Sequence, residues 1–252
     1  MKTKQLFHME HQLVILCAVS AIMAGGAEPL YGQNDIDVPC PALQQNEERA
    51  IENIVLATEN REAAEIINLA LQDTLLGYES RARAYYIKAL NIEPQSAIAL
   101  CGLMLLEQAD RSLYTQQLQQ LTAIINSPDF LATPEELFYI ETFLKIISGD
   151  VVGAADDFAE RSERYRADLL AACWSISLYH SIGDQDKSHA LARQLYEKHP
   201  DNILCQYLHC LVYENDDVIP DEIIKLSRET CNAWRHHPMV AHLAGHLMYS
   251  NG

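Results

Sequence analysis

Apolar residues recur every three to four positions along most of this chain, which is the spacing of one face of an α-helix. Short turn signals interrupt the pattern and divide it into segments of helical length. Helices are expected over residues 43–58, 61–76, 79–92, 96–108, 112–126, 133–148, 152–164, 167–181, 185–198, 203–214, 220–234 and 238–250. No stretch alternates with a period of two for long enough to predict a β-strand. The pattern therefore predicts an all-α protein.

The turn signals themselves repeat. Pro94 and Pro128 each follow a predicted helix and lie 34 residues apart, and the turns at Gly149 and Gly183 have the same separation. Paired helices that return at a fixed period of this length are typical of an α-solenoid, in which each pair covers the apolar face of its neighbour. We expect about five antiparallel helix pairs with an unpaired helix at each end.

One helix start is marked by several signals together. Thr133 can cap the helix, Pro134 suits its first turn, and Glu136 stands three residues after Thr133, as in a capping box. A helix is therefore expected to begin at this point.

Small and apolar residues occupy equivalent positions in successive windows of 34 residues. They are Ile66, Leu69, Ala70, Ala82, Tyr86 and Ala89 in 63–96, Phe138, Ala154 and Phe158 in 135–168, Ala172, Ile176, Tyr179, Ser188, Ala192 and Leu195 in 169–202, and Ala241, Ala244, Gly245 and Met248 in the last helix. On these residues the chain from about 45 to 252 resembles the tetratricopeptide repeat (TPR) family. The window 97–130 departs from the family pattern, because Met104, Gln116 and Gln120 replace residues that are usually small or aromatic.

The resemblance implies a concave groove lined by the first helix of each pair, which in this family binds peptides or folded proteins. Carried over by repeat position, the groove residues would be Glu136, Tyr139, Phe143, Cys173, Ser177, His180, His242, His246 and Tyr249. Such a groove is aromatic and apolar, with histidines at one end.

The N-terminus has the order of a secretory signal peptide. Lys2 and Lys4 precede an apolar run over 13–24, and small residues follow it. We expect residues 1–27 to be a signal peptide cleaved near Ala27, although an uncleaved anchor stays open. Residues 28–42 are expected to form an extended lead-in, and 43–252 the repeat domain. The protein would then be exported to the periplasm, the cell envelope or the medium.

Charge narrows the classes of partner. The 252 residues include 18 basic and 35 acidic residues, for a formal net charge of −17. Such a surface repels phosphate backbones and anionic lipids, so we expect no nucleic acid partner and no membrane contact beyond the signal segment.

Six cysteines remain after the predicted leader is removed, and export would permit disulfides. Five of them fall in helical patterns, where a small apolar thiol packs well, so buried free thiols are expected. The alternative is a bridge between Cys210 and Cys231.

Candidate chemistry is limited to histidines near the C-terminus. His242 and His246 are four residues apart on a predicted helix, so their imidazoles project to one side and could bind a divalent metal. Leu243 stands where zinc metallopeptidases have their catalytic glutamate, and a third ligand would have to come from His209, Glu214 or His236. We expect groove or surface histidines, with no metal, no cofactor and no catalysis, and keep the metal site as the alternative.

The helix 238–250 lacks the second helix of its pair. The sequence could be part of a longer protein, the helix could cap the solenoid, or a second protomer could cover it, perhaps through helix 43–58. The function expected is that of an exported TPR-like scaffold that mediates protein–protein interaction through its concave face. The alternatives are a metal-binding protein and a helical accessory domain of a larger protein.

Overall fold

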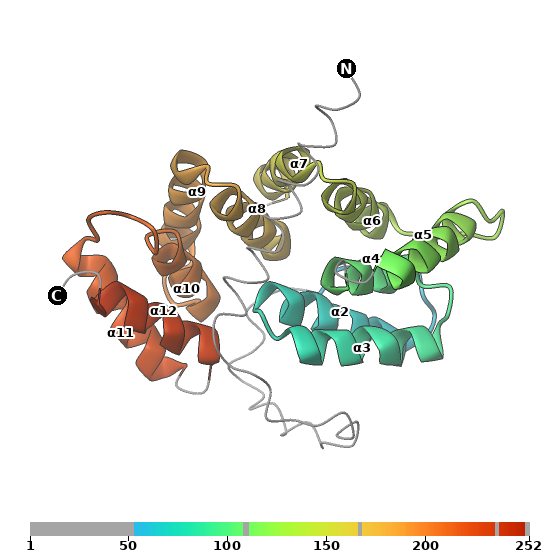
Figure 1. Cartoon of the computed structure of the whole chain (residues 1–252), viewed down its shortest axis with the longest axis horizontal. Helices are drawn as coiled ribbons and strands as arrows, with labels where there is room; N and C mark the ends of the chain where they lie inside the picture. The colour runs from blue at the N-terminus through green and yellow to red at the C-terminus, as the bar shows by residue number, and fades with distance from the viewer. Residues whose placement is uncertain (1–52, 108–110, 166–167, 235–236, 250–252) are drawn as a thin grey trace. The chain divides into compact units, whose positions relative to one another are not determined.

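The computed structural model describes residues 53–107, 111–165, 168–234 and 237–249. Over these residues the regular structure is α-helical, with eleven helices joined by short connections (Figure 1). They are α2 (Arg61–Leu75), α3 (Glu79–Ile92), α4 (Ala97–Leu106), α5 (Arg111–Ile125), α6 (Pro134–Ile147), α7 (Val151–Arg164), α8 (Leu169–Ser181), α9 (Gln185–Lys198), α10 (Ile203–Leu211), α11 (Asp221–Ala233) and α12 (Pro238–Tyr249). Consecutive helices pack together from α2 to α5 and from α8 to α12, so the predicted all-α, solenoid-like fold is confirmed.

The predicted helix 43–58 is wrong over the part that the structure describes. Residues 53–58 are not helical, whereas 43–52 lie outside the described residues. The main-chain N–H groups of Ile54, Val55 and Ala57 donate to side chains of other elements instead of to carbonyls four residues earlier. A helix cannot form where these donors are used elsewhere, and residues 53–58 therefore offer no helical face for a second protomer.

Contacts among the described residues cluster into two compact units, 53–154 and 155–249, with the boundary inside α7. In the first unit α4 is central, because it packs against α2, α3, α5 and α6. This position explains why eight of its residues are buried and why it shows almost no polar face. A helix that is apolar on all sides is expected only where neighbours surround it.

A glycine allows two helices of the first unit to approach closely. Gly102 of α4 faces the ring of Tyr86 of α3, which is fully buried. The Tyr86 hydroxyl is 3.1 Å from Oγ1 of Thr74 on α2, so its polar atom is satisfied inside the core. Burial raises the pKa of Tyr86 well above its ordinary value, and the phenol stays neutral.

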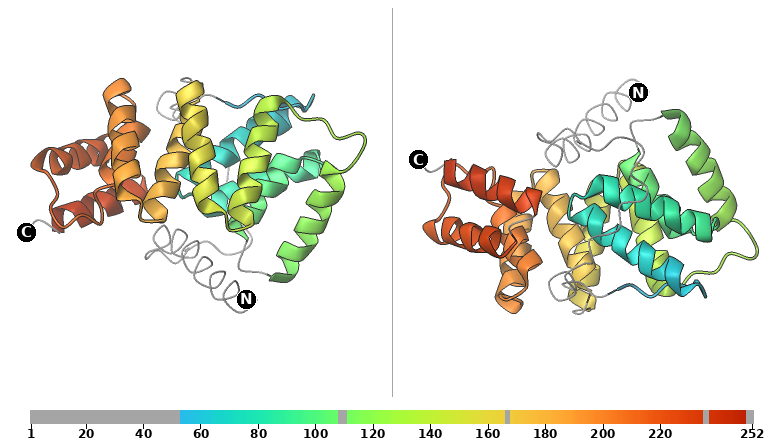
Figure 2. Two further views of the ribbon diagram at one scale, coloured as in Figure 1. Left: turned by 90° about the horizontal axis from the view of Figure 1, so that it is seen from above. Right: turned by 90° about the horizontal axis from the view of Figure 1, so that it is seen from below.

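In the second unit each helix from α8 to α12 packs against the next, and α10 also contacts α8 and α12. Figure 2 shows α11 and α12 side by side in both views. The start of α8 is fixed by Asp168, whose carboxylate accepts a hydrogen bond from the Ala171 N–H at 3.0 Å and pairs with the Arg161 guanidinium. Both members of this ion pair are largely buried.

Three of the turns between helices share one main-chain geometry. Gly77, Gly149 and Gly183 have φ values of 74°, 88° and 77°, a region that only glycine enters without strain. The residue after each glycine donates its main-chain N–H to a carbonyl in the last turn of the preceding helix, as in the 3.0 Å bond from Asp184 N to Tyr179 O. The predicted turns at Gly149 and Gly183 are confirmed, including their separation of 34 residues.

The cysteine prediction is confirmed for the residues that the structure describes. Cys101, Cys173, Cys205 and Cys210 are buried and free, and Cys231 is a half-buried free thiol, so the alternative bridge between Cys210 and Cys231 is absent. Burial raises the pKa of the Cys101, Cys205 and Cys210 thiols to about 12, which keeps them protonated and unreactive.

The predicted signal peptide (1–27), the lead-in (28–42) and Cys40 lie outside the described residues. Among the helices that are described, none combines the length and the apolar character needed to cross a membrane.

Candidate functional site

In the first unit, a non-helical segment of residues 53–57 lies against α2 and the start of α6. Asn68, on α2, pairs its side-chain amide with the main chain of Ile54. The Ile54 N–H donates to Asn68 Oδ1 at 2.8 Å, and Asn68 Nδ2 donates to the Ile54 carbonyl at 3.2 Å. Such a pair reproduces the hydrogen bonds that a neighbouring β-strand would make. The side chains of Ile54 and Asn68 are both buried, at 4% and 5% exposure.

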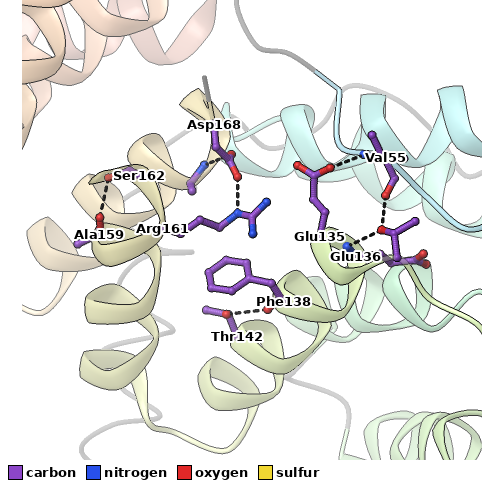
Figure 3. Close-up of polar contacts among 11 residues, drawn as sticks. Val55, Glu135, Glu136, Phe138, Thr142, Ala159, Arg161, Ser162 and Asp168 are labelled. Carbon is purple, nitrogen blue, oxygen red and sulfur yellow. Dashed lines mark hydrogen bonds and ion pairs between the residues drawn. The ribbon is translucent and has the colours of Figure 1, made fainter. Parts of the chain in front are cut away.

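The first turn of α6 holds the next residues of the same segment. Glu135 accepts a hydrogen bond from the Val55 N–H, and Glu136 accepts one from the Ala57 N–H, both at 2.9 Å. The Thr133 hydroxyl donates to the Val55 carbonyl at 2.6 Å. Figure 3 shows the Glu135 carboxylate directed at the Val55 main chain. Five hydrogen bonds from side chains thus reach the main chain of three residues.

The local sequence explains why α6 can do this. Thr133 accepts a bond from the Glu136 N–H at 3.0 Å and so caps the helix as the sequence predicts. Negative charge beside a helix N-terminus is stabilised by the helix dipole, which favours Glu135 and Glu136 at this place. Burial raises the pKa of Glu136, while the hydrogen bonds from the Ala57 and Thr133 main chain act in the opposite direction.

The residues predicted to line a groove on α6 and α8 differ in accessibility. Tyr139, Phe143 and Cys173 have no exposed surface, and the Tyr139 and Phe143 rings meet edge to face with centroids 5.9 Å apart. These three side chains pack in the cores of their units. Ser177 and His180 are half-buried. Burial lowers the pKa of His180, so its imidazole is neutral near pH 7.

Of the same predicted set, Glu136 contacts the segment of residues 53–57, through the Ala57 N–H. The three members on α12 are more accessible. His242 is half-buried, His246 is exposed and Tyr249 is 91% exposed. The two imidazoles lie on one side of the helix with ring centroids 4.5 Å apart, as their spacing predicts.

A carboxylate lies beside these two histidines and is the third possible ligand. Glu214 brings a carboxylate oxygen to the pair, and one ligand atom from each of the three residues lies within 4.8 Å of the others. His209 takes a different place: it is buried and stacks on Tyr196 with ring centroids 4.8 Å apart. Burial lowers its pKa, the neighbouring His189 and Arg193 act in the same direction, and Glu197 opposes them. His236, the other ligand considered from the sequence, lies outside the described residues.

Sequence reasoning missed Asn68 and Glu135 as residues that contact the segment. A signal existed for Asn68, because an asparagine between Ile67 and Leu69 in a predicted helix disfavours the helix and needs a polar partner when buried. Glu135 carried no such signal, since an acidic residue in a first helical turn is common.

Comparison with known proteins assigns no family: no protein-family model, no curated protein and no solved structure matches this chain.

Proposed function

We propose that this chain is an exported, TPR-like scaffold that mediates protein–protein interaction by holding an extended polypeptide segment through its main chain. One observation carries the proposal: side chains of α2 and α6 satisfy the main chain of residues 54, 55 and 57 with five hydrogen bonds. The resemblance of residues 45–252 to TPR proteins supports it, because that family binds peptides along its first helices. Export rests on the signal-like pattern of residues 1–27.

The contacts define the kind of segment that would be recognised. Main-chain bonds are independent of the side chains of the ligand, so they tolerate many sequences and require only an extended backbone. Ile54 adds one apolar requirement, because its side chain is buried at 4% exposure, whereas Val55 is 63% exposed and adds little. The expected partner segment is extended, with an apolar residue at the place of Ile54.

In this structure the chain's own segment occupies the site. A partner must therefore compete with a tethered ligand, whose effective concentration is of millimolar order for a short flexible tether. Each hydrogen bond contributes about 0.5–1.5 kcal/mol net, and burial of an isoleucine adds about 2 kcal/mol. After the cost of ordering the peptide, a free segment should bind with a dissociation constant between about 1 µM and 1 mM.

Cleavage of the tether tests this. A protease site is inserted between Thr58 and Glu59, ahead of the Asn60 cap of α2, and the protein is cut after folding. A labelled peptide of residues 51–58 is then titrated against the cut protein and followed by fluorescence anisotropy. The peptide is expected to bind the cut protein with a dissociation constant between about 1 µM and 1 mM. It should bind weakly or not at all to the uncut protein, because the chain's own segment fills the site.

Matched variants decide whether binding uses the site. The peptide change Ile54→Asp and the protein change Asn68→Ala should each weaken binding at least tenfold, because they remove the buried side chain or the amide pair. The peptide change Val55→Ala and the protein change Asn126→Ala alter exposed residues and should have little effect. Failure of the peptide to bind, or binding that Asn68→Ala leaves unchanged, would show that residues 53–57 are only a structural tether.

Export has its own test. Expression with a C-terminal tag in a bacterial host, followed by mass spectrometry of the periplasmic fraction, should give a chain that starts close to residue 28. A full-length chain confined to the cytoplasm would contradict the proposal on this point and leave the binding site untouched.

A further inference from the structure

Three side chains of the kinds that bind transition metals converge in the second unit. They are Glu214, His242 and His246, and their ligand atoms lie within 4.8 Å of one another. The first comes from the turn after α10, and the other two come from α12. These residues are 28 and 32 positions apart in the sequence, so the tertiary fold brings the carboxylate to the histidines.

The packing of α12 aims both histidines away from the core. Val240, Leu243 and Leu247 are buried, and they anchor one face of the helix against its neighbours. His242 and His246 lie one turn apart on another face, where the first is half-buried and the second exposed. Their ring planes are inclined by 59°, so the two imidazoles do not stack flat on each other.

The early end of α10 supplies the third group. The sequence predicts helix up to residue 214, but α10 ends at Leu211 and the chain turns, with the Glu214 N–H bonded to the Leu211 carbonyl at 3.0 Å. Because α10 packs against α12, the turn that follows it lies within reach of the histidine face.

The local charge favours a cation. Residues 199–224 contain no lysine or arginine, and Asp216 and Asp217 follow Glu214 closely. No basic residue occurs in 238–249 apart from the two histidines. These acidic residues and the net charge of −17 favour a cation, against the opposing charge of Arg193 on α9, which lies close enough to act on Tyr213.

We propose that Glu214, His242 and His246 form a binding site for a borderline divalent transition-metal ion such as zinc. Two imidazoles and one carboxylate are a ligand set that zinc accepts in proteins, with bonds of about 2.0–2.2 Å. Ligand atoms then need to lie about 3.3 Å apart, so small side-chain rotations from the present separation close the site. Three protein ligands leave one coordination position for water or for a group from a partner. The bound ion would tie the turn after α10 to α12 and so hold the C-terminal helix in place.

Zinc titration of the whole chain by isothermal calorimetry, after treatment with EDTA, tests the site. One zinc ion per chain is expected to bind. His242→Ala and Glu214→Gln should each lower the affinity more than about 100-fold, since changes in groups that merely orient ligands already cost about 10–100-fold. His199→Ala removes a half-buried histidine at the end of α9 and should leave the affinity unchanged.

A second readout separates a lost ligand from a damaged fold. Zinc should slow hydrogen exchange of the α12 amides in the wild type and in His199→Ala, but not in Glu214→Gln, whose changed residue lies outside α12. If His242→Ala does not fold, His246→Ala replaces it, because His246 is exposed. The proposal is overturned if zinc binds only at millimolar concentration, if binding survives both His246→Ala and Glu214→Gln, or if α12 exchange is indifferent to zinc.

Discussion

Substitution of Gly102 by alanine is the sharpest probe of the packing in the first unit. A Cβ at this position would lie 2.5 Å from the Tyr86 hydroxyl oxygen and still closer to two carbons of the same ring. Real Cβ atoms do not make such contacts, so the ring or α4 must move. The ring has little freedom, because Tyr86 is fully buried and its hydroxyl contacts Thr74.

Two opposing effects set the magnitude. Alanine is favoured over glycine inside a helix by about 1 kcal/mol. Overpacking of a close-packed core costs about 1–3 kcal/mol and sometimes more. The overlap involves two ring carbons and the hydroxyl oxygen of a fully buried tyrosine, so the upper part of that range applies. Gly102→Ala should therefore lower the free energy of unfolding by about 1–2 kcal/mol net.

The same change at two other glycines gives matched controls. Gly245, in α12, has no atom within 4 Å of the position of a Cβ, so Gly245→Ala should stabilise the protein by about 0.5–1 kcal/mol. Gly183 also has open space, but its φ of +77° is unfavourable for alanine, and Gly183→Ala should destabilise by about 1 kcal/mol. Urea unfolding followed by circular dichroism measures all three.

The order of the three variants tests the reasoning. Gly245→Ala should be the most stable, and Gly102→Ala the least. A Gly102→Ala protein that is as stable as the wild type would mean that Tyr86 can move at little cost. The close packing described for α3 and α4 would then be refuted.

Three further predictions concern burial and hydrogen bonding. Ala154 is fully buried, so Ala154→Leu should destabilise by about 1–3 kcal/mol in urea unfolding, whereas a neutral result would indicate unfilled space. Burial lowers the pKa of His209 in the folded protein. As the pH falls below about 6.5, the His209 imidazole is therefore protonated in the unfolded chain before it is protonated in the folded chain. The free energy of unfolding should decline from pH 7 to pH 5, and it should decline less in His209→Gln. Asn68→Ala strands two buried main-chain groups of Ile54 and should cost about 1–3 kcal/mol, with faster hydrogen exchange at the Ile54 amide as the local readout.

The candidate sites were only partly predictable. Glu136 was expected to line a groove from its repeat position; in the structure its carboxylate accepts a hydrogen bond from the Ala57 N–H of the chain's own segment, and contact with a ligand stays a prediction. Tyr139 and Phe143 were expected beside it, but they are fully buried, because repeat position does not tell which side of a helix its neighbours cover. His242 and His246 could be paired from their spacing, whereas Glu214 was one of three possible third ligands until the turn after α10 was known.

The sequence by itself determined the helices and the turns between them. Apolar spacing, proline, and glycine at positive φ act within a few residues, so their effect is readable without the rest of the chain, as the turns at Gly149 and Gly183 illustrate. The tertiary structure decided which groups meet across long separations. Residues 53–57 look helical in isolation, yet they are not helical, because Asn68, Thr133 and the first turn of α6 satisfy their main chain. The free energy of such contacts depends on residues that are distant in the sequence, so a local sequence pattern does not predict these contacts.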